Sequence, residues 1–106
     1  MSREYDKLVR DDIPAVVEED GETPVTHVVD GEEYEERLFE KLAEETTELR
    51  EEPGADELAD VLEVLDALRA QFGIDEAKLE RVREEKAAAR GRFDEGVVLE
   101  RIEDQV

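Results

Sequence analysis

The chain has 106 residues, of which 34 are acidic and 14 are basic, so its formal net charge is −20. This charge argues against binding to nucleic acid or to anionic lipid, because both are recognised largely by cations that neutralise phosphate. The absence of cysteine and the single histidine exclude disulfides, thiolate metal sites and multi-histidine zinc sites.

The first 30 residues are predicted to hold one short helix and a weakly extended segment. The helix spans about 12–20, with Pro14 in its first turn and Gly21 after its end. Val25, His27 and Val29 alternate along the chain with Thr26 and Val28, which indicates a weakly extended segment. His27 lies in this segment, so we expect it to be a partly exposed strand residue rather than a member of a site.

Two longer helices are predicted in the middle of the chain. The first of them spans about 31–51, with Asp30 as its candidate N-cap. The Pro-Gly pair at 53–54 then breaks the chain, and the next helix spans about 55–72 until Gly73 ends it. Because the connection is short, the two helices are expected to form an antiparallel hairpin.

A fourth helix is predicted over 76–90, with Asp75 as its cap and Gly91 at its end. The remaining residues are expected to form an extended tail that packs its apolar side chains on the helices. We therefore predict a single helical domain over 1–106, made of an N-terminal segment, a helical core and a C-terminal tail: 1–30, 31–90 and 91–106.

The predicted third helix is apolar over a wider arc than one partner helix would cover. Its apolar residues are Leu58, Val61, Leu62, Val64, Leu65, Leu68 and Phe72. We predict an all-α fold in which the antiparallel hairpin and its flanking helices complete a four-helix bundle on dimerisation, as a homodimer or higher homo-oligomer. In the alternative, the fourth helix and the tail cover this arc within one chain.

The predicted hairpin carries an acidic pattern, E-E-x-x-E followed after a short gap by E-x-x-D, at Glu44, Glu45, Glu48, Glu57 and Asp60. On a helical projection that starts from Tyr34, Glu45 falls at about 20° and Glu48 at about −40°, inside and beside the apolar stripe. In an antiparallel hairpin, Glu45 is level with Asp60 and Glu48 with Glu57. Four carboxylates that converge in a partly dry place cannot all stay ionised without cations.

Oxygen ligands without sulfur or imidazole favour a hard metal ion, and Mg²⁺ fits best because it commonly links carboxylates to substrate phosphates. Mn²⁺ is the expected substitute ion. The metal ligands would be Glu45, Glu48, Glu57 and Asp60. In the alternative interpretation, these acids pair with arginines such as Arg37 or Arg69, or extend into solvent.

Further motifs lie at both ends of the chain. It opens with YDKLVRDDIP at 5–14, and K-x-x-x-R-G-x-F follows at 86–93. Between them lie Tyr34, Leu38, KLAEE at 41–45, Glu48 and ELADV at 57–61. With these motifs the chain resembles the MazG-type all-α nucleoside triphosphate pyrophosphohydrolases, which include phosphoribosyl-ATP pyrophosphatase-like relatives. The gap between Glu48 and Glu57 is shorter than in many of those relatives.

The resemblance implies Mg²⁺-dependent hydrolysis of a nucleoside triphosphate to a monophosphate and pyrophosphate, with clearance of damaged or excess nucleotides as the expected role. It implies the same four metal ligands, with Glu44 as a supporting or water-orienting carboxylate. The catalytic base is expected to be Glu44 or Glu45, since His27 is single and distant along the chain. The family works as dimers or larger assemblies.

Phosphates also need positive side chains. Lys86 and Arg90 share one face of the predicted fourth helix, and Lys7 and Arg10 lie three apart in the opening segment. We expect Lys86 to contact phosphate. For Arg90, Lys7 and Arg10, substrate binding and a role in holding the dimer or the tail both stay open.

Two other functions stay open at this stage. One is the phosphoribosyl-ATP step of histidine synthesis, which uses the same metal chemistry, and the other is a non-enzymatic acidic helical module that binds a basic partner. The charged start of the chain and the lack of any apolar run of ~18 residues indicate a cytoplasmic protein without a membrane span. The acidic coat with only four lysines indicates adaptation to high salt.

Overall fold

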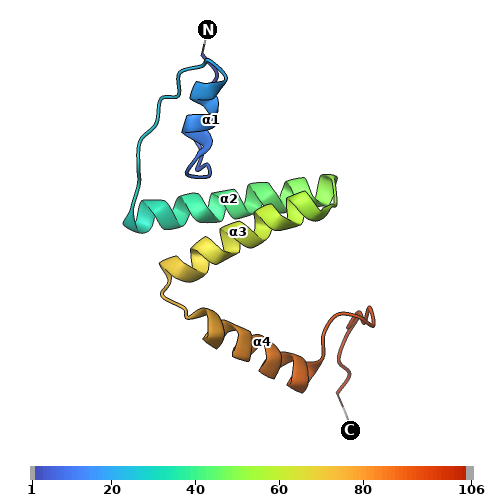
Figure 1. Ribbon diagram of the computed structural model, residues 1–106. Coiled ribbons are helices and arrows are strands. Elements are labelled where there is room, and N and C mark those ends of the chain that lie inside the picture. The colour runs from blue at the N-terminus through green and yellow to red at the C-terminus, as the bar shows by residue number, and fades with distance from the viewer. Residues whose placement is uncertain (1, 105–106) are drawn as a thin grey trace. The chain divides into compact units, whose positions relative to one another are not determined.

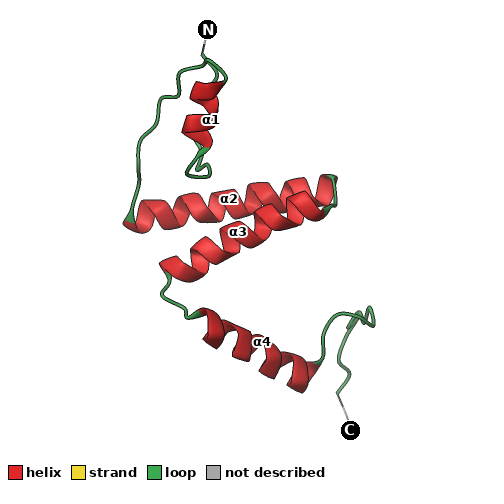
Figure 2. Cartoon of the chain, in the orientation of Figure 1, coloured by secondary structure: helices red, strands yellow, loops and turns green. Residues whose placement is uncertain are grey.

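The computed structural model describes residues 2–104, which form four α-helices and no strand (Figure 1). The helices are α1 (Ile13–Glu19), α2 (Gly31–Glu51), α3 (Ala55–Gln71) and α4 (Glu76–Arg90). Figure 2 shows that loops and turns make up the rest of the described chain. The all-α prediction is confirmed for these residues. No helix among them combines the length and the apolar character needed to cross a membrane.

The ends of the helices follow local sequence signals. The Asp75 side chain accepts a hydrogen bond of 3.1 Å from the backbone N–H of Lys78, as the cap of α4. Gly91 follows α4 with a φ of 80°, a left-handed conformation that glycine adopts without steric cost. Asp30 precedes α2 as predicted, but its side chain makes no capping hydrogen bond. The bounds of α2 and α4 agree with their predicted ranges.

The chain divides into two compact units, Met1–Gly73 and Ile74–Val106. In the first unit, α2 and α3 pack against each other and are joined by a connection of three residues (Figure 1). The core cluster between them consists of Leu38, Val64 and Leu68, which are 2%, 8% and 7% exposed. Leu8 and Tyr34 are half-buried against this cluster, together with Leu42 and Ala67. Tyr34 therefore belongs to the core.

One face of the first unit keeps large apolar side chains in solvent. Val61, Val64 and Leu68 are buried on α3, whereas the same helix exposes Leu58, Leu62, Leu65 and Phe72. Phe39 of α2 lies beside Phe72, with ring centroids 6.2 Å apart, and both rings are about half exposed. The wide apolar arc of α3 is thus only partly covered within this unit.

Residues 22–30 and 91–104 contain no helix or strand. Val25 and Val28 are both 97% exposed, because no neighbouring strand pairs with the segment predicted to be extended. In the second unit, Phe93, Val97, Val98 and Leu99 are also exposed. The packing of this tail on the helices stays a prediction, as does the single-domain organisation of the chain.

Candidate functional site

Glu45 is the buried acid of α2. It lies one helical turn after Leu42 on the packed side of the helix, and its side chain is 8% exposed. Lys41 Nζ lies 3.2 Å from Glu45 Oε1 and forms an ion pair with it. Glu45 Oε2 is buried and has no hydrogen-bond partner. A buried polar atom without a partner costs about 1–3 kcal/mol, so this oxygen is a strong acceptor left available.

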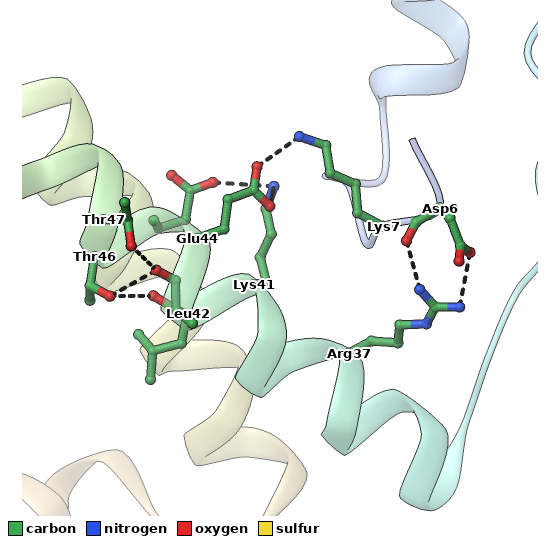
Figure 3. Close-up of polar contacts among 10 residues, drawn as sticks. Asp6, Lys7, Arg37, Lys41, Leu42, Glu44, Thr46 and Thr47 are labelled. Carbon is green, nitrogen blue, oxygen red and sulfur yellow. Dashed lines mark hydrogen bonds and ion pairs between the residues drawn. The ribbon is translucent and has the colours of Figure 1, made fainter. Parts of the chain in front are cut away.

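Glu44 lies next to this acid and is held by two lysines. Lys7 Nζ donates a hydrogen bond of 2.7 Å to Glu44 Oε1, and Lys41 Nζ donates one of 3.4 Å to Glu44 Oε2 (Figure 3). The hydrogen bond from Lys7 is the main reason why the pKa of Glu44 is lowered, although partial burial opposes the shift. Glu44 is therefore ionised throughout the neutral pH range.

Glu48 lies one turn beyond Glu44 and Glu45 on α2 and is exposed. A hydrogen bond with Glu45, followed by the charge of Glu45, raises the pKa of Glu48. The two carboxylates therefore lie close enough for the charge of one to disfavour ionisation of the other. Thr46 and Thr47 lie between Glu45 and Glu48 in the sequence. Their hydroxyls donate hydrogen bonds to the Leu42 and Ala43 carbonyls within the helix (Figure 3).

On α3, Asp60 pairs with a cation of the opening segment, and Glu57 lies in the first turn of the helix. Asp60 Oδ1 accepts a hydrogen bond of 2.8 Å from Arg10, and both Asp60 and Glu45 raise the pKa of Arg10, the hydrogen bond with Asp60 being the main cause. One Glu57 carboxylate oxygen lies 3.4 Å from where a side chain on Gly54 would begin, close to the start of its own helix.

The six acids and cations that meet at the α2–α3 pair are called the acid cluster below: Lys7, Arg10, Lys41, Glu44, Glu45 and Asp60, with Glu48 at its edge. Among residues 2–104, no group of three or more His, Cys, Asp or Glu side chains has a spacing that could hold a metal ion. The convergence of Glu45, Glu48, Glu57 and Asp60 on one ion thus stays a prediction.

The cations that the structure places at the acid cluster are Lys7, Arg10 and Lys41. Arg37 forms an ion pair with Asp6, and Arg69 forms one with Asp66. Lys41 was not predicted as a site residue, although its spacing of three and four residues from Glu44 and Glu45 is the spacing at which helical side chains meet.

Of the four predicted phosphate ligands, the structure brings Lys7 and Arg10 to the acid cluster. Lys86 and Arg90 lie on α4 in the second unit. Both are in exposed positions on that helix, four residues apart. Their role in substrate binding stays a prediction.

The donor chemistry of the acid cluster fits a hard divalent cation. Glu45 Oε2 is a buried carboxylate oxygen without a partner, and Glu48 lies beside it at the solvent. Carboxylate oxygens are the preferred protein ligands of Mg²⁺, and an exposed edge leaves room for the water ligands that Mg²⁺ retains. A cation here would also relieve the repulsion between the two carboxylates.

Comparison of the chain with family models, curated proteins and solved structures gives no match. The resemblance to the MazG-type hydrolases therefore depends on the sequence motifs themselves.

Replacing Glu48 by glutamine is expected to raise the melting temperature without metal at about pH 7.5, but not at about pH 3.5. The neighbouring Glu45 raises the pKa of Glu48 in the folded state. Glu48 therefore stabilises the fold below its ordinary pKa, and this stabilisation is lost as pH rises through the raised pKa. The substitution removes the repulsion that remains at higher pH. Thermal melts in EDTA at the two pH values, with the exposed Glu36→Gln as control, test this; an equal effect at both would contradict it.

Proposed function

We propose that the chain is a Mg²⁺-dependent nucleoside triphosphate pyrophosphohydrolase that produces a nucleoside monophosphate and pyrophosphate. The observation that carries the proposal is the Glu45 carboxylate, which is buried with one oxygen unpaired and has Glu48 beside it. An acidic coat that only solvates the protein would place its acids outward. Lys7 and Arg10 at the same cluster supply the positive charge that phosphates need.

In this proposal, Glu45, Glu48, Glu57 and Asp60 hold Mg²⁺, with Mn²⁺ as a substitute. When bound, the ion supplies positive charge to the phosphate oxygens.

The remaining side chains of the cluster have separate tasks. Glu44 is ionised and orients the attacking water by accepting its hydrogen bond, while Glu44 or Glu45 takes the proton. Lys7 and Arg10 transfer their hydrogen bonds from the acids to the phosphates when the nucleotide binds, and Lys86 and Arg90 are further candidates for this contact. The attack is in line at a phosphorus, with pyrophosphate as the leaving group.

The proposal also includes a homodimer or higher homo-oligomer in the cytoplasm. The exposed apolar face of α3, with Leu58, Leu62, Leu65 and Phe72, fits a second copy of the α2–α3 pair in a four-helix bundle. We expect Leu62→Glu to convert the oligomer to monomer, because a charge at a buried helix contact is costly. Light scattering coupled to size exclusion measures this, with Val28→Glu in the exposed loop as control. A wild-type monomer would contradict the bundle.

A panel of nucleotides tests the proposed reaction. Canonical and modified nucleoside triphosphates are incubated with the protein in Mg²⁺ or in EDTA, and pyrophosphate and monophosphate are quantified. We expect equal amounts of both products with several triphosphates, and none in EDTA. Release confined to phosphoribosyl-ATP would instead assign the step in histidine synthesis. Absence of hydrolysis across the panel would favour the acidic interaction module.

A further inference from the structure

The segment before α1 contacts both α2 and α3. Leu8 is half-buried against the core cluster, and the residues on either side of it reach the acid cluster. Lys7 hydrogen-bonds Glu44 of α2, whereas Arg10 hydrogen-bonds Asp60 of α3. A short piece of chain thus places two cations beside acids that lie 37 and 50 residues further along the sequence.

Arg37 of α2 anchors this segment one residue before Lys7. Its guanidinium donates hydrogen bonds of 2.8 Å to the Asp6 carbonyl oxygen and 3.0 Å to Asp6 Oδ1, from two separate nitrogens (Figure 3). The charge and planar shape of a guanidinium suit this two-point contact, which a lysine cannot reproduce.

Asp6 has a φ of 43° and is the one residue other than glycine with a positive φ in the described chain. Side chains are disfavoured in this left-handed region, although aspartate tolerates it better than most. The two hydrogen bonds from Arg37 therefore hold a backbone conformation that the segment would otherwise leave. Since Lys7 follows directly, the conformation of Asp6 sets the direction in which Lys7 and the residues after it leave the turn.

We propose that Arg37 is a positioning residue for substrate binding: by holding the Asp6 turn it keeps Lys7 and Arg10 at the acid cluster, where they receive the phosphates of a nucleotide. The nucleotide in this inference rests on the proposed function, whereas the placement of the two cations does not. Without ligand, Arg10 pairs with the proposed metal ligand Asp60, and Lys7 adds positive charge near Glu45 and Glu48, so both cations oppose the binding of a divalent cation.

Loss of the Arg37 contact should change the affinity for a divalent cation and the affinity for a nucleotide in opposite directions. Loosening the turn removes two competing cations from the acids, so a divalent cation binds more tightly. The same change removes two phosphate ligands, so the nucleotide binds more weakly. Local unfolding of the segment, by contrast, would expose the core cluster and weaken the binding of both ligands.

The first experiment measures both ligands on Arg37→Gln, Lys7→Gln and the double variant. Mg²⁺ is titrated calorimetrically without nucleotide, and kcat and KM are measured with a triphosphate that the wild type hydrolyses. Arg37→Gln should bind Mg²⁺ about threefold more tightly, and raise KM about tenfold with kcat changed less than about threefold. If Arg37 acts through Lys7, the double variant should show a smaller KM effect than the product of the single effects.

Arg69→Gln is the matched control. Arg69 is 21% exposed, as is Arg37, and it forms an ion pair of 3.1 Å with Asp66 on its own helix. Its loss removes a half-buried arginine without loosening the Asp6 turn, so Mg²⁺ affinity and KM should stay at the wild-type values.

A second experiment needs neither metal nor activity. The rate at which an amine-acylating reagent labels Lys7 is followed by mass spectrometry, with the exposed Lys78 as internal reference. Loss of the ion pair with Glu44 should make Lys7 react about threefold faster in Arg37→Gln, and not in Arg69→Gln. Faster labelling without any hydrolysis by the wild type would support the positioning and reject only the proposed reaction. Wild-type labelling in Arg37→Gln would overturn the inference even if hydrolysis is found.

Discussion

Glu45→Gln is expected to lower kcat for pyrophosphate release by roughly 10³-fold or more while leaving the protein folded. The substitution removes the charge of the one acid that is buried with an unpaired oxygen, and this oxygen is the strongest candidate metal ligand. Asp60→Asn, on the opposite helix, should cause a loss of the same order. Steady-state release of pyrophosphate at saturating Mg²⁺ measures both effects.

Glu36→Gln is the control for these two substitutions, because Glu36 lies exposed on the same helix as Glu45. It should keep wild-type kcat. Thermal melts of each variant establish that activity is not lost through unfolding, and Glu45→Gln should melt at or above the wild-type temperature because a repulsive carboxylate is removed. Wild-type kcat in either Glu45→Gln or Asp60→Asn would contradict the assigned roles.

Leu38→Ala is expected to destabilise the fold by about 3 kcal/mol, a large share of the ~5–10 kcal/mol that holds a domain of this size. Leu38 is 2% exposed and is the most buried member of a core cluster of three buried residues. Its truncation leaves a cavity at the contact between α2 and α3. Chemical denaturation followed by circular dichroism measures the loss.

Val28→Ala is the matched control for this truncation. Val28 is 97% exposed in the loop before α2, so removal of its methyl groups should change the free energy of unfolding by less than about 0.5 kcal/mol. Equal destabilisation by the two substitutions would show that the α2–α3 contact does not form the stabilising core.

The helices could be predicted from sequence because their ends are set locally. The Pro-Gly pair at 53–54 separates α2 from α3, and Asp75 caps α4 through the backbone of Lys78. The pattern at 25–29 predicted an extended segment less reliably, because a strand needs a partner strand that this part of the chain does not provide. Local signals thus determine helices well and isolated extended segments poorly.

The candidate site could be predicted only in part. The burial of Glu45 follows from its position on the apolar stripe of α2, which periodicity alone reveals. The contacts of Lys7 and Arg10 could not be predicted in the same way, because they depend on how a segment without regular structure crosses two helices. The position of the Glu57 carboxylate near Gly54 depends on a side-chain rotamer, on which sequence spacing carries no information.

Thermal melting during a titration with Mg²⁺ tests most directly whether the acid cluster binds a divalent cation. Ionic strength is kept constant with NaCl, because added salt alone stabilises a chain with a net charge of −20. The wild type should gain stability that saturates, about 2.7 kcal/mol at a hundred times the dissociation constant. A non-hydrolysable triphosphate should add to it, and Glu45→Gln should abolish it. No gain at constant ionic strength, or the same gain in Glu45→Gln, would contradict a metal site at Glu45.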